Sequence, residues 1–400
     1  MHADPLLTEL IEHKRRLLVD TLDALLSQVD LTDSQYETAR NRYEAVSAWL
    51  AECESPFLKV ASIYSQGSIA MGTANKPIAR DEFDVDLVCH LPSVGTRSDP
   101  AAVKALIGDR LKAHGTYAAM LEEKQRCWRI SYAREFHLDI TPSIPNPDCA
   151  NGGELVPDRA SSIWKPTNPK GYATRFERYA ALRPRLRLSE AAIVSKRADV
   201  EQFPDQEMSK PLLKRIVQLL KRHRDVSFAA RGRAEVAPIS IILTTLAARS
   251  YALCATRFAY ADAYELMIDV VRRMPEFIGV TQRNGMPFYF IENETTVGEN
   301  FADKWNLDPR LPSAFYGWHK AVLALLDLLV RLEGKDRLSQ QLQESFGATR
   351  DAVRLAMAPL TSTVGNARAT GSLLVAPSLG VVTGPAAGRV NVRPNTFFGR

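Results

Sequence analysis

The chain has 400 residues, of which 46% are hydrophobic and 24% are charged. This composition is ordinary for a globular protein and leaves room for two or three domains with their own cores. Because no run of about 18 apolar residues occurs, the sequence predicts no membrane-spanning helix and no membrane partner. The net charge of +5 suits phosphate-bearing ligands, but it is too small to indicate a long polynucleotide partner by itself.

The cysteines and histidines show no metal-binding or disulfide pattern. The five cysteines are scattered without a C-x-x-C pair, and the seven histidines form no H-E-x-x-H motif. Neither a disulfide scaffold nor a structural zinc site is therefore expected. The N-terminus interleaves acids and bases with its leucines and does not resemble a signal peptide. Together these features predict a reducing, cytoplasmic location.

The N-terminal third of the chain begins with helices. Leucines at helical spacing predict a long helix over residues 5–30. Thr32 and Gln35 have the spacing of a capping box and predict the start of a second helix. We expect both helices to form a structural spine. Residues 58–145 then interleave alternating strands with the helical stretch "DPAAVKALIGDRLKAH", which indicates a mixed α/β domain.

Two neighbouring segments predict a hairpin, and the remainder turns helical. "RCWRISY" and "FHLDITPSI" alternate in polarity on either side of a short break at residues 133–135, which predicts an antiparallel pair. Residues 145–170 are rich in Pro, Gly and Asn and predict a long surface loop or a small excursion between elements. The helices expected after this loop lie at 172–200, 208–225, 236–255, 261–274 and 313–333.

The segment "DVDL" places two acids on one strand. Asp84 and Asp86 are two residues apart, so their side chains share one face, while Phe83, Val85 and Leu87 point the other way into a core. Two adjacent carboxylates repel each other unless a cation lies between them, and hard divalent ions prefer oxygen ligands. The alternative is a solvated strand face that carries two surface acids.

A glycine-serine turn shortly before this strand points to phosphate chemistry. Gly67-Ser68 follows the strand-like stretch "VASIYSQ". Backbone N–H groups and a hydroxyl at such a turn can bind a phosphate. A lone Gly-Ser pair is weak evidence, but followed by D-x-D on a strand it is much more specific.

Phosphoryl transfer with two metal ions needs a further carboxylate. Asp139 supplies it, because it is an acid in the otherwise apolar second strand of the predicted hairpin. The alternative is that Asp139 is a buried acid paired with a nearby arginine, such as Arg129 or Arg134.

With these residues identified, the chain resembles the DNA polymerase β-type nucleotidyltransferase superfamily over residues 63–88 and 136–142. The longer pattern "SQGSIAMGT…KPI…DEFDVDLV" is similar to one branch, the bacterial cyclic-oligonucleotide synthases (CD-NTases), which are relatives of cyclic GMP-AMP synthase and oligoadenylate synthase. Looser matches are "LKRIVQLLKRHRD", "ENFADKW" and "RPNTFFG".

The resemblance implies an α/β plus α fold. It would be a bilobed, polymerase β-like nucleotidyltransferase with a mixed central sheet, a long N-terminal spine helix and a helical C-terminal lobe. On this basis residues 1–200 hold the spine helices and the nucleotidyltransferase core. Residues 201–362 form the helical lobe, which resembles that of oligoadenylate synthase, and residues 363–400 form a flexible tail.

The resemblance also implies roles for the motif residues. Asp84 and Asp86 would hold two Mg²⁺ ions together with the donor triphosphate, and Mn²⁺ would be able to substitute. Asp139 would join the metal that activates the acceptor hydroxyl, while the Gly67-Ser68 turn would grip the donor phosphates and pyrophosphate would leave.

A lysine on the 211–225 helix resembles the triphosphate ligand of the family. Lys221 is the choice over Lys214, which lies two turns earlier on the same face. Ser240, at the start of the next helix, is a weaker phosphate-binding candidate. The alternative is that both lysines are solvated on the outer face of an amphipathic helix.

The function implied by the resemblance is synthesis of a cyclic di- or trinucleotide second messenger from nucleoside triphosphates, with ATP expected and GTP or UTP possible as substrates. The product would switch on a downstream effector in antiphage (CBASS) signalling. Two alternatives within the superfamily are a linear-chain RNA nucleotidyltransferase and an antitoxin-type protein adenylyltransferase. A third, from another class, is a catalytically inactive nucleotide-binding scaffold.

Two expectations concern partners. The chain lacks the His-Cys-Cys-Cys zinc loop by which animal cyclic GMP-AMP synthase binds DNA, so no DNA activator is expected. In relatives of this branch a ubiquitin-transfer-like partner can act on the C-terminal tail. Here the chain ends Gly399-Arg400, one residue past the glycine, so either a partner acts after trimming or the tail is a simple chain end.

Overall fold

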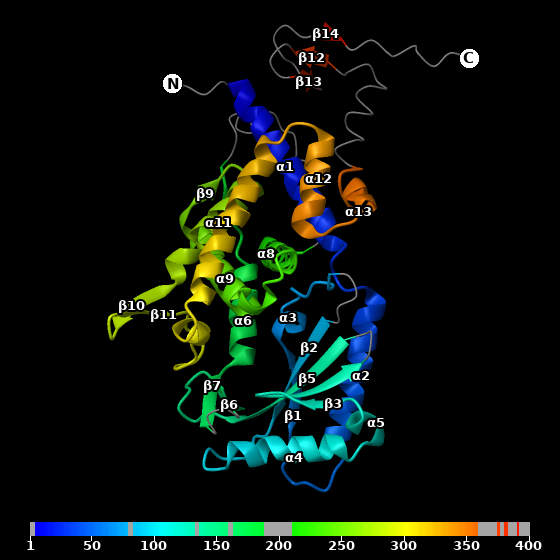
Figure 1. Ribbon diagram of the computed structural model, residues 1–400, viewed down its shortest axis with the longest axis vertical. Coiled ribbons are helices and arrows are strands. Elements are labelled where there is room, and N and C mark those ends of the chain that lie inside the picture. Colours follow the sequence, from blue (N-terminus) through cyan, green and yellow to red (C-terminus); the bar gives the residue numbers. More distant parts are fainter. Residues whose placement is uncertain are drawn as a thin grey trace, which may run out of the picture.

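The computed structural model describes residues 5–78, 83–132, 136–158, 163–187 and 210–358, with three short strands beyond them. A sheet lobe (blue to cyan) lies below a helical lobe (green to orange) in Figure 1. The three short strands are β12 (Leu374–Ala376), β13 (Gly380–Val382) and β14 (Val390–Asn391). The rest of the expected tail, with Gly399 and Arg400, lies outside the described residues, so the tail partner stays a prediction.

The two N-terminal helices pack in different lobes. Helix α1 (Pro5–Ser27) packs against α10, α11 and α13 of the helical lobe, whereas α2 (Asp33–Ala51) contributes Val46 and Leu50 to the core of the sheet lobe. The expected capping box is confirmed, because Thr32 and Gln35 each accept a hydrogen bond from the backbone N–H of the other. The N-terminal spine is therefore shared between the lobes.

The sheet lobe is built on a mixed sheet with the strand order β1-β2-β5-β4-β3. Strands β2 and β5 are parallel, and the other neighbours in this order are antiparallel. The predicted D-x-D strand is confirmed as β2 and the predicted hairpin as β4–β5. The strands are β1 (Ser62–Gln66), β2 (Phe83–His90), β3 (Leu121–Glu123), β4 (Trp128–Tyr132) and β5 (Phe136–Pro145).

One face of this sheet is apolar and the other is polar. The apolar face buries Val85, Leu87, Leu138 and Ile140 in one core with side chains of α2 and of α4 (Pro100–Lys112). The short helix α5 (Gly115–Ala118) follows α4. The polar face is bordered by the short helix α3 (Gly67–Ala70), and it is the face on which the candidate acids lie.

The expectation of a surface loop over residues 145–170 is wrong. Strands β6 (Glu154–Asp158) and β7 (Ile163–Thr167) pair as an antiparallel hairpin, and β6 continues the sheet from β5. The Pro, Gly and Asn residues cluster before β6, where the chain turns, and they obscure the short strand that follows.

The helical lobe surrounds α8, which Figure 1 places close to the sheet lobe. Its hydrophobic core also includes side chains of α1 and α6, although both helices precede residue 200, and a boundary at that position stays a prediction. The helices are α6 (Pro169–Ala180), α8 (Leu212–Ala229), α9 (Ser240–Arg257), α10 (Ala263–Arg273), α11 (Arg310–Arg331), α12 (Lys335–Phe346) and α13 (Arg350–Ala356).

The helix expected over 172–200 is wrong at residues 181–187, because α6 ends at Ala180. Pro184 disfavours helical geometry at the residue before it and cannot donate a backbone hydrogen bond. The chain instead forms β8 (Arg185–Leu186), which pairs with β9 (Ala259–Tyr260). Residues 188–209 lie outside the described residues. A further hairpin, β10 (Gly279–Arg283) with β11 (Met286–Phe290), projects from this lobe in Figure 1.

Helix α11 is, among the described residues, the one helix with the length and apolar composition that a membrane span would need. Its apolar side chains are used within the fold, because Phe315, Trp318 and Leu326 are buried in the core of the helical lobe. Packing therefore accounts for the apolar character of this helix.

Arg215 of α8 ties this helix to α1. Its side chain is 1% exposed and donates hydrogen bonds to Asp23 Oδ1 at 2.6 Å and Asp30 Oδ2 at 3.0 Å. Arg215→Ala would leave both carboxylates without this partner, so we expect the free energy of unfolding to fall by about 3 kcal/mol. Chemical denaturation measures this loss. Arg257→Ala, at an exposed arginine ending α9, is the control and should change stability by less than about 0.5 kcal/mol. Equal losses in the two variants would contradict the assignment.

Candidate active site

A row of polar side chains crosses the sheet on one face. In the strand register Gln66 of β1 lies opposite Asp86 of β2, Asp86 lies opposite Asp139 of β5, and Asp139 lies opposite Arg129 of β4. Residues directly opposite each other on paired strands point to the same face. Asp84 lies two residues before Asp86 and shares that face. The structure therefore brings the three candidate acids together.

Arg129 binds two of these acids. Its Nε donates to Asp139 Oδ1 at 2.7 Å, and its Nη2 donates to Asp139 Oδ2 at 2.8 Å and to Asp84 Oδ1 at 3.1 Å. The Asp139 side chain is 13% exposed and that of Asp84 is 56% exposed. The hydrogen bonds to Asp139 raise the pKa of Arg129. Asp139 is thus paired with an arginine in this structure. This pairing is the alternative that the sequence offered to a metal-ligating role.

Asp86 is the acid without a hydrogen bond from Arg129, and its charge is poorly compensated. Burial raises the pKa of Asp86 to about 7, and the charges of Asp139 and Asp84 add to this effect, while Arg129 and Lys221 oppose it. A carboxyl group with this environment favours a bound proton or a nearby cation.

The donor set fits a hard divalent cation, although the acids are not yet arranged around one. Within the described ranges no group of three or more His, Cys, Asp or Glu side chains is gathered as a metal site. The guanidinium of Arg129 occupies the oxygens of Asp139 that would face such an ion. All three candidates are carboxylates, the ligand type that Mg²⁺ prefers. Burial and the charges of Asp139 and Asp84 raise the pKa of Asp86, and a nearby cation would oppose both effects.

The Gly67-Ser68 turn lies against Asp86. Gly67 has a φ of +67°, and a Cβ atom at this position would lie 2.4 Å from Asp86 Oδ2. Glycine is therefore required here by both backbone geometry and space. Ser68 follows within α3 and is half-buried. The turn and the D-x-D strand, predicted to cooperate, are in direct contact.

Helix α8 holds the loop that connects this turn to β2. Three of its side chains donate hydrogen bonds to backbone carbonyls of the loop at 2.9–3.0 Å: Lys221 to Thr73, Gln218 to Ala74 and Arg222 to Lys76. Lys221 is 7% exposed, which excludes the alternative of a solvated surface lysine. Burial lowers the pKa of Lys221 to about 8, with the charge of Arg224 acting in the same direction.

The two other polar candidates on this side have protein partners. Lys214 forms an ion pair with Glu177 of α6 at 2.8 Å. Ser240, the first residue of α9, accepts a hydrogen bond through Oγ from Arg224 Nη1 at 3.1 Å. Arg224 lies one turn after Lys221 on α8, so Ser240 is connected to the Lys221 region through this arginine.

Sequence reasoning missed the functional candidates Gln66 and Arg224 and treated Arg129 only as a salt-bridge partner. A signal for Arg129 was available. Arg129 and Asp139 lie five residues on either side of the centre of the break at 133–135, and an antiparallel hairpin places such residues opposite each other. No comparable spacing rule identifies Arg224.

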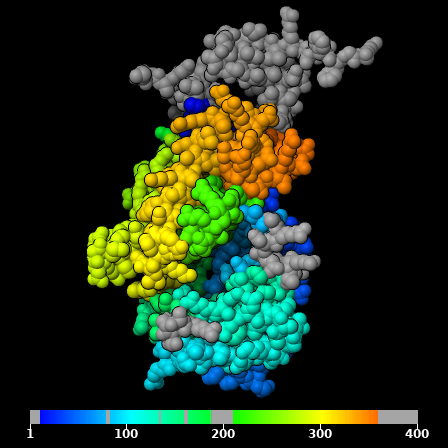
Figure 2. Space-filling model, viewed as in Figure 1, coloured from blue at the N-terminus to red at the C-terminus, as the bar shows by residue number. Residues whose placement is uncertain are grey.

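A recess separates the two lobes. Figure 2 shows it between α8 and the sheet lobe, with the blue segment around α3 at its floor. Helix α8 and the sheet lobe therefore border this recess, and the candidate acids lie in the sheet lobe on β2 and β5.

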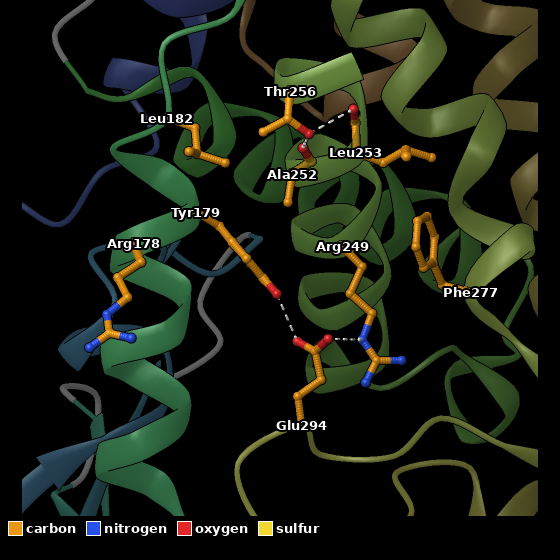
Figure 3. Close-up of a pocket in the computed structure, with 9 residues that line it drawn as sticks. All are labelled: Arg178, Tyr179, Leu182, Arg249, Ala252, Leu253, Thr256, Phe277 and Glu294. Atoms are coloured by element: carbon orange, nitrogen blue, oxygen red, sulfur yellow. Dashed lines mark hydrogen bonds and ion pairs between the residues drawn. The ribbon is translucent and has the colours of Figure 1, made fainter. Parts of the chain in front are cut away.

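A second cavity of about 470 Å³ lies within the helical lobe between α6 and α9. Figure 3 shows Tyr179 and Arg249 pointing toward Glu294. Tyr179 donates to Glu294 Oε2 at 3.1 Å, and Arg249 Nε lies 3.6 Å from Glu294 Oε1. None of the candidate acids lines this cavity, so it is separate from the row of acids on the sheet.

Comparison with known proteins reveals similarity over most of the chain. Residues 17–179 match the family model of the Second Messenger Oligonucleotide or Dinucleotide Synthetase domain (SMODS). The chain is 30% identical over 388 residues to a c-di-GMP synthase of Roseivirga ehrenbergii, covering 96% of this chain and 97% of that protein. It is 29% identical over 329 residues to the cyclic dinucleotide synthase CdnG of Bradyrhizobium diazoefficiens, covering 76% of this chain and 75% of that protein.

Solved structures share the fold. The CD-NTase CdnG of Bradyrhizobium diazoefficiens in complex with GTP superposes with a TM-score of 0.62 at 22% identity, over 84% of this chain and 97% of that one. CdnC of E. coli MS115-1 with ATP superposes with a TM-score of 0.55 at 14% identity, over 82% of this chain and 97% of that one. The expected bilobed nucleotidyltransferase fold, with a mixed sheet and a helical lobe, is confirmed.

The environment of Asp86 predicts a pH-dependent stability. Its pKa rises from 3.8 to about 7 on folding, so the folded state loses the proton less readily than the unfolded state. Ionisation of Asp86 therefore destabilises the fold, by an amount that is absent below about pH 4, grows as the pH rises and is complete above about pH 7. Because the side chain is partly exposed, we expect Asp86→Asn to stabilise the metal-free protein by about 2 kcal/mol at pH 8.

Denaturation in EDTA at pH 8 and pH 4.5 measures this effect, and the gain should shrink at the lower pH. Asp139→Asn is the matched control, since it removes a carboxylate that Arg129 binds and should lower stability at pH 8. A stabilisation by Asp86→Asn that is equal at both pH values would contradict the proposed cause.

Proposed function

Because this chain belongs to the bacterial CD-NTases, the nucleotidyltransferases that build cyclic oligonucleotides from nucleoside triphosphates, we propose that it makes a cyclic dinucleotide from GTP. The choice of a guanine dinucleotide is supported by the relative that matches this chain almost from end to end, which is named a c-di-GMP synthase. A second relative is a cyclic dinucleotide synthase, and its structure holds GTP.

The single observation that carries the catalytic assignment is the row of acids on the polar face of the sheet. Asp84, Asp86 and Asp139 share this face, beside a turn that touches Asp86, and the charge of the buried Lys221 acts on Asp86. In the proposed function these three residues hold divalent ions, Mg²⁺ or Mn²⁺. When bound, such ions supply positive charge to the attacking and leaving oxygens of an in-line displacement.

The remaining candidates bind and orient the substrate in this proposal. The Ser68 hydroxyl and the backbone of the Gly67-Ser68 turn donate to triphosphate oxygens next to Asp86. Lys221 holds Thr73 in place and contributes its charge at the border of the recess. Its pKa of about 8 leaves the Lys221 side chain mostly protonated at neutral pH, as a residue that binds an anion must be. Ser240 acts more remotely, through Arg224.

The cellular role that we propose is a cytoplasmic second-messenger synthase in antiphage signalling, whose product activates an effector. This role rests on the family alone. All five cysteines of the chain are free, which fits a reducing compartment.

The product itself is the test of the proposed function. The purified protein is incubated with all four ribonucleoside triphosphates and Mg²⁺ or Mn²⁺, treated with phosphatase and analysed by mass spectrometry. We expect a phosphatase-resistant cyclic dinucleotide that contains guanine. Chains that phosphatase trims to linear oligonucleotides would support a linear polymerase instead.

The double variant Asp84→Ala/Asp86→Ala is expected to fold and to make no product, because both acids lie on the polar face outside the core. The control Asp336→Ala/Asp351→Ala removes two exposed acids of the helical lobe and should retain activity. Product formation by the first variant at the wild-type rate would refute the site assignment.

Alanine variants of two glycines that both have a positive φ distinguish displacement of Asp86 from a general loss of stability. Gly67 and Gly72 have φ values of +67° and +64°, but a Cβ at Gly67 would collide with Asp86, whereas one at Gly72 would meet the nearest atom, Lys214 Nζ, at 3.5 Å. We expect both alanine variants to lose thermal stability through the positive φ, and Gly67→Ala to lose more because of the collision. Gly67→Ala alone should lower kcat/KM, on the order of 100-fold, because it displaces a catalytic carboxylate. Equal losses of kcat/KM in the two variants would contradict this interpretation.

A further inference from the structure

The guanidinium of Arg129 lies where the acids of the candidate site would face a cation. It binds both oxygens of Asp139, at 2.7 and 2.8 Å, and one oxygen of Asp84, at 3.1 Å. The side chain is 23% exposed and reaches the acids from β4, which pairs with β5 at this register. Arg129 is therefore a fixed feature of the polar face and not a freely moving surface residue.

This contact uses the same oxygens that a divalent ion would need. A two-pronged guanidinium–carboxylate pair with charge-assisted hydrogen bonds is among the stronger polar contacts in proteins. It also leaves the charge balance incomplete, since one guanidinium faces three carboxylates and Asp86 accepts no hydrogen bond from it. The site thus contains one guanidinium, which is bound to two of the three acids, and its net charge from these groups remains negative.

We propose that Arg129 is a competing counter-ion of the metal site. In the resting enzyme it neutralises Asp139 and Asp84, and it has to release Asp139 before these acids can hold a divalent ion. Arg129 thereby sets the metal concentration at which the site fills. This inference rests on the proposed function in one respect, namely that the acids bind divalent ions.

The competition gives Arg129 two measurable effects of opposite sign. Without metal, its loss leaves three carboxylates close together, so the protein should become less stable. With metal, its loss removes both the competing hydrogen bonds and a repelling positive charge, so the ion should bind more tightly. A residue that merely holds Asp139 in the correct position for the metal would weaken metal binding when it is removed.

The test is a titration of the full-length protein with Mn²⁺ alone, without nucleotide, in which electron paramagnetic resonance counts the free ion. We expect Arg129→Gln to bind Mn²⁺ at least about ten-fold more tightly than the wild type. Arg129→Lys keeps the charge but loses the two-pronged geometry, and it should have an intermediate affinity. Arg283→Gln removes the same charge from the distant β10–β11 hairpin and should leave the affinity unchanged.

Thermal melting provides the second readout. Arg129→Gln should melt at a lower temperature than the wild type in EDTA, and saturating Mn²⁺ should raise its melting temperature more than that of the wild type. Equal or weaker Mn²⁺ binding by Arg129→Gln would overturn the proposal while leaving the proposed function intact. If neither the wild type nor any folded variant binds Mn²⁺, both this inference and the metal-dependent function are wrong. Because Arg129→Lys preserves the charge balance, its place in the affinity order decides the question even if the glutamine variant folds poorly.

Discussion

The structure depends on how α8 supplies hydrogen bonds to the loop between α3 and β2. Backbone carbonyls of this loop are partly shielded from water by the helical lobe, and an unpaired buried carbonyl is costly. Side chains of Lys221, Gln218 and Arg222 provide the donors. A helix of one lobe thereby fixes the position of the turn that carries Gly67 in the other. The distance between the Gly67-Ser68 turn and the acids is consequently a property of the interface between the lobes.

The acid row shows how a site can be assembled at an electrostatic cost. Sheet pairing forces Asp86 and Asp139 to lie side by side, because they occupy opposite positions in a parallel register. Folding therefore buries Asp86 and brings like charges together, and the two effects, burial first, raise the pKa of Asp86. Arg129 relieves part of the repulsion at Asp139 and Asp84. Such stored repulsion is common where a site is built to bind a cation, since the ligand then supplies the missing compensation.

Lys221 connects these two features. It holds the loop through Thr73, and its charge also lowers the pKa of Asp86. Its own pKa is lowered because burial disfavours the charged form. One side chain therefore contributes to the interface between the lobes and to the electrostatics of the acids. Its burial follows from its position on a helix that is packed on nearly every side, a situation that amphipathic patterning does not reveal.

The sequence by itself determined the strand that carries Asp84 and Asp86, because strict alternation of polar and apolar residues is the pattern of a half-buried strand. It also determined the hairpin that carries Asp139. Arg129 and Asp139 are equally far from the centre of the break between the two strands, so the sequence also indicates that these two residues pair. It misled at residues 145–170, where turn residues obscured β6, and at residues 181–187, which follow the end of α6 and contain Pro184.

Only the tertiary structure decided which residues of different elements meet. Three features depend on it: Gly67 contacts Asp86, Lys221 is buried, and Arg224 donates a hydrogen bond to Ser240. Each of them brings together segments that are distant in the chain or on different elements. Local periodicity reports which way a side chain faces within its own element. It carries no information about which residues of other elements a side chain contacts, because those contacts depend on how the elements pack.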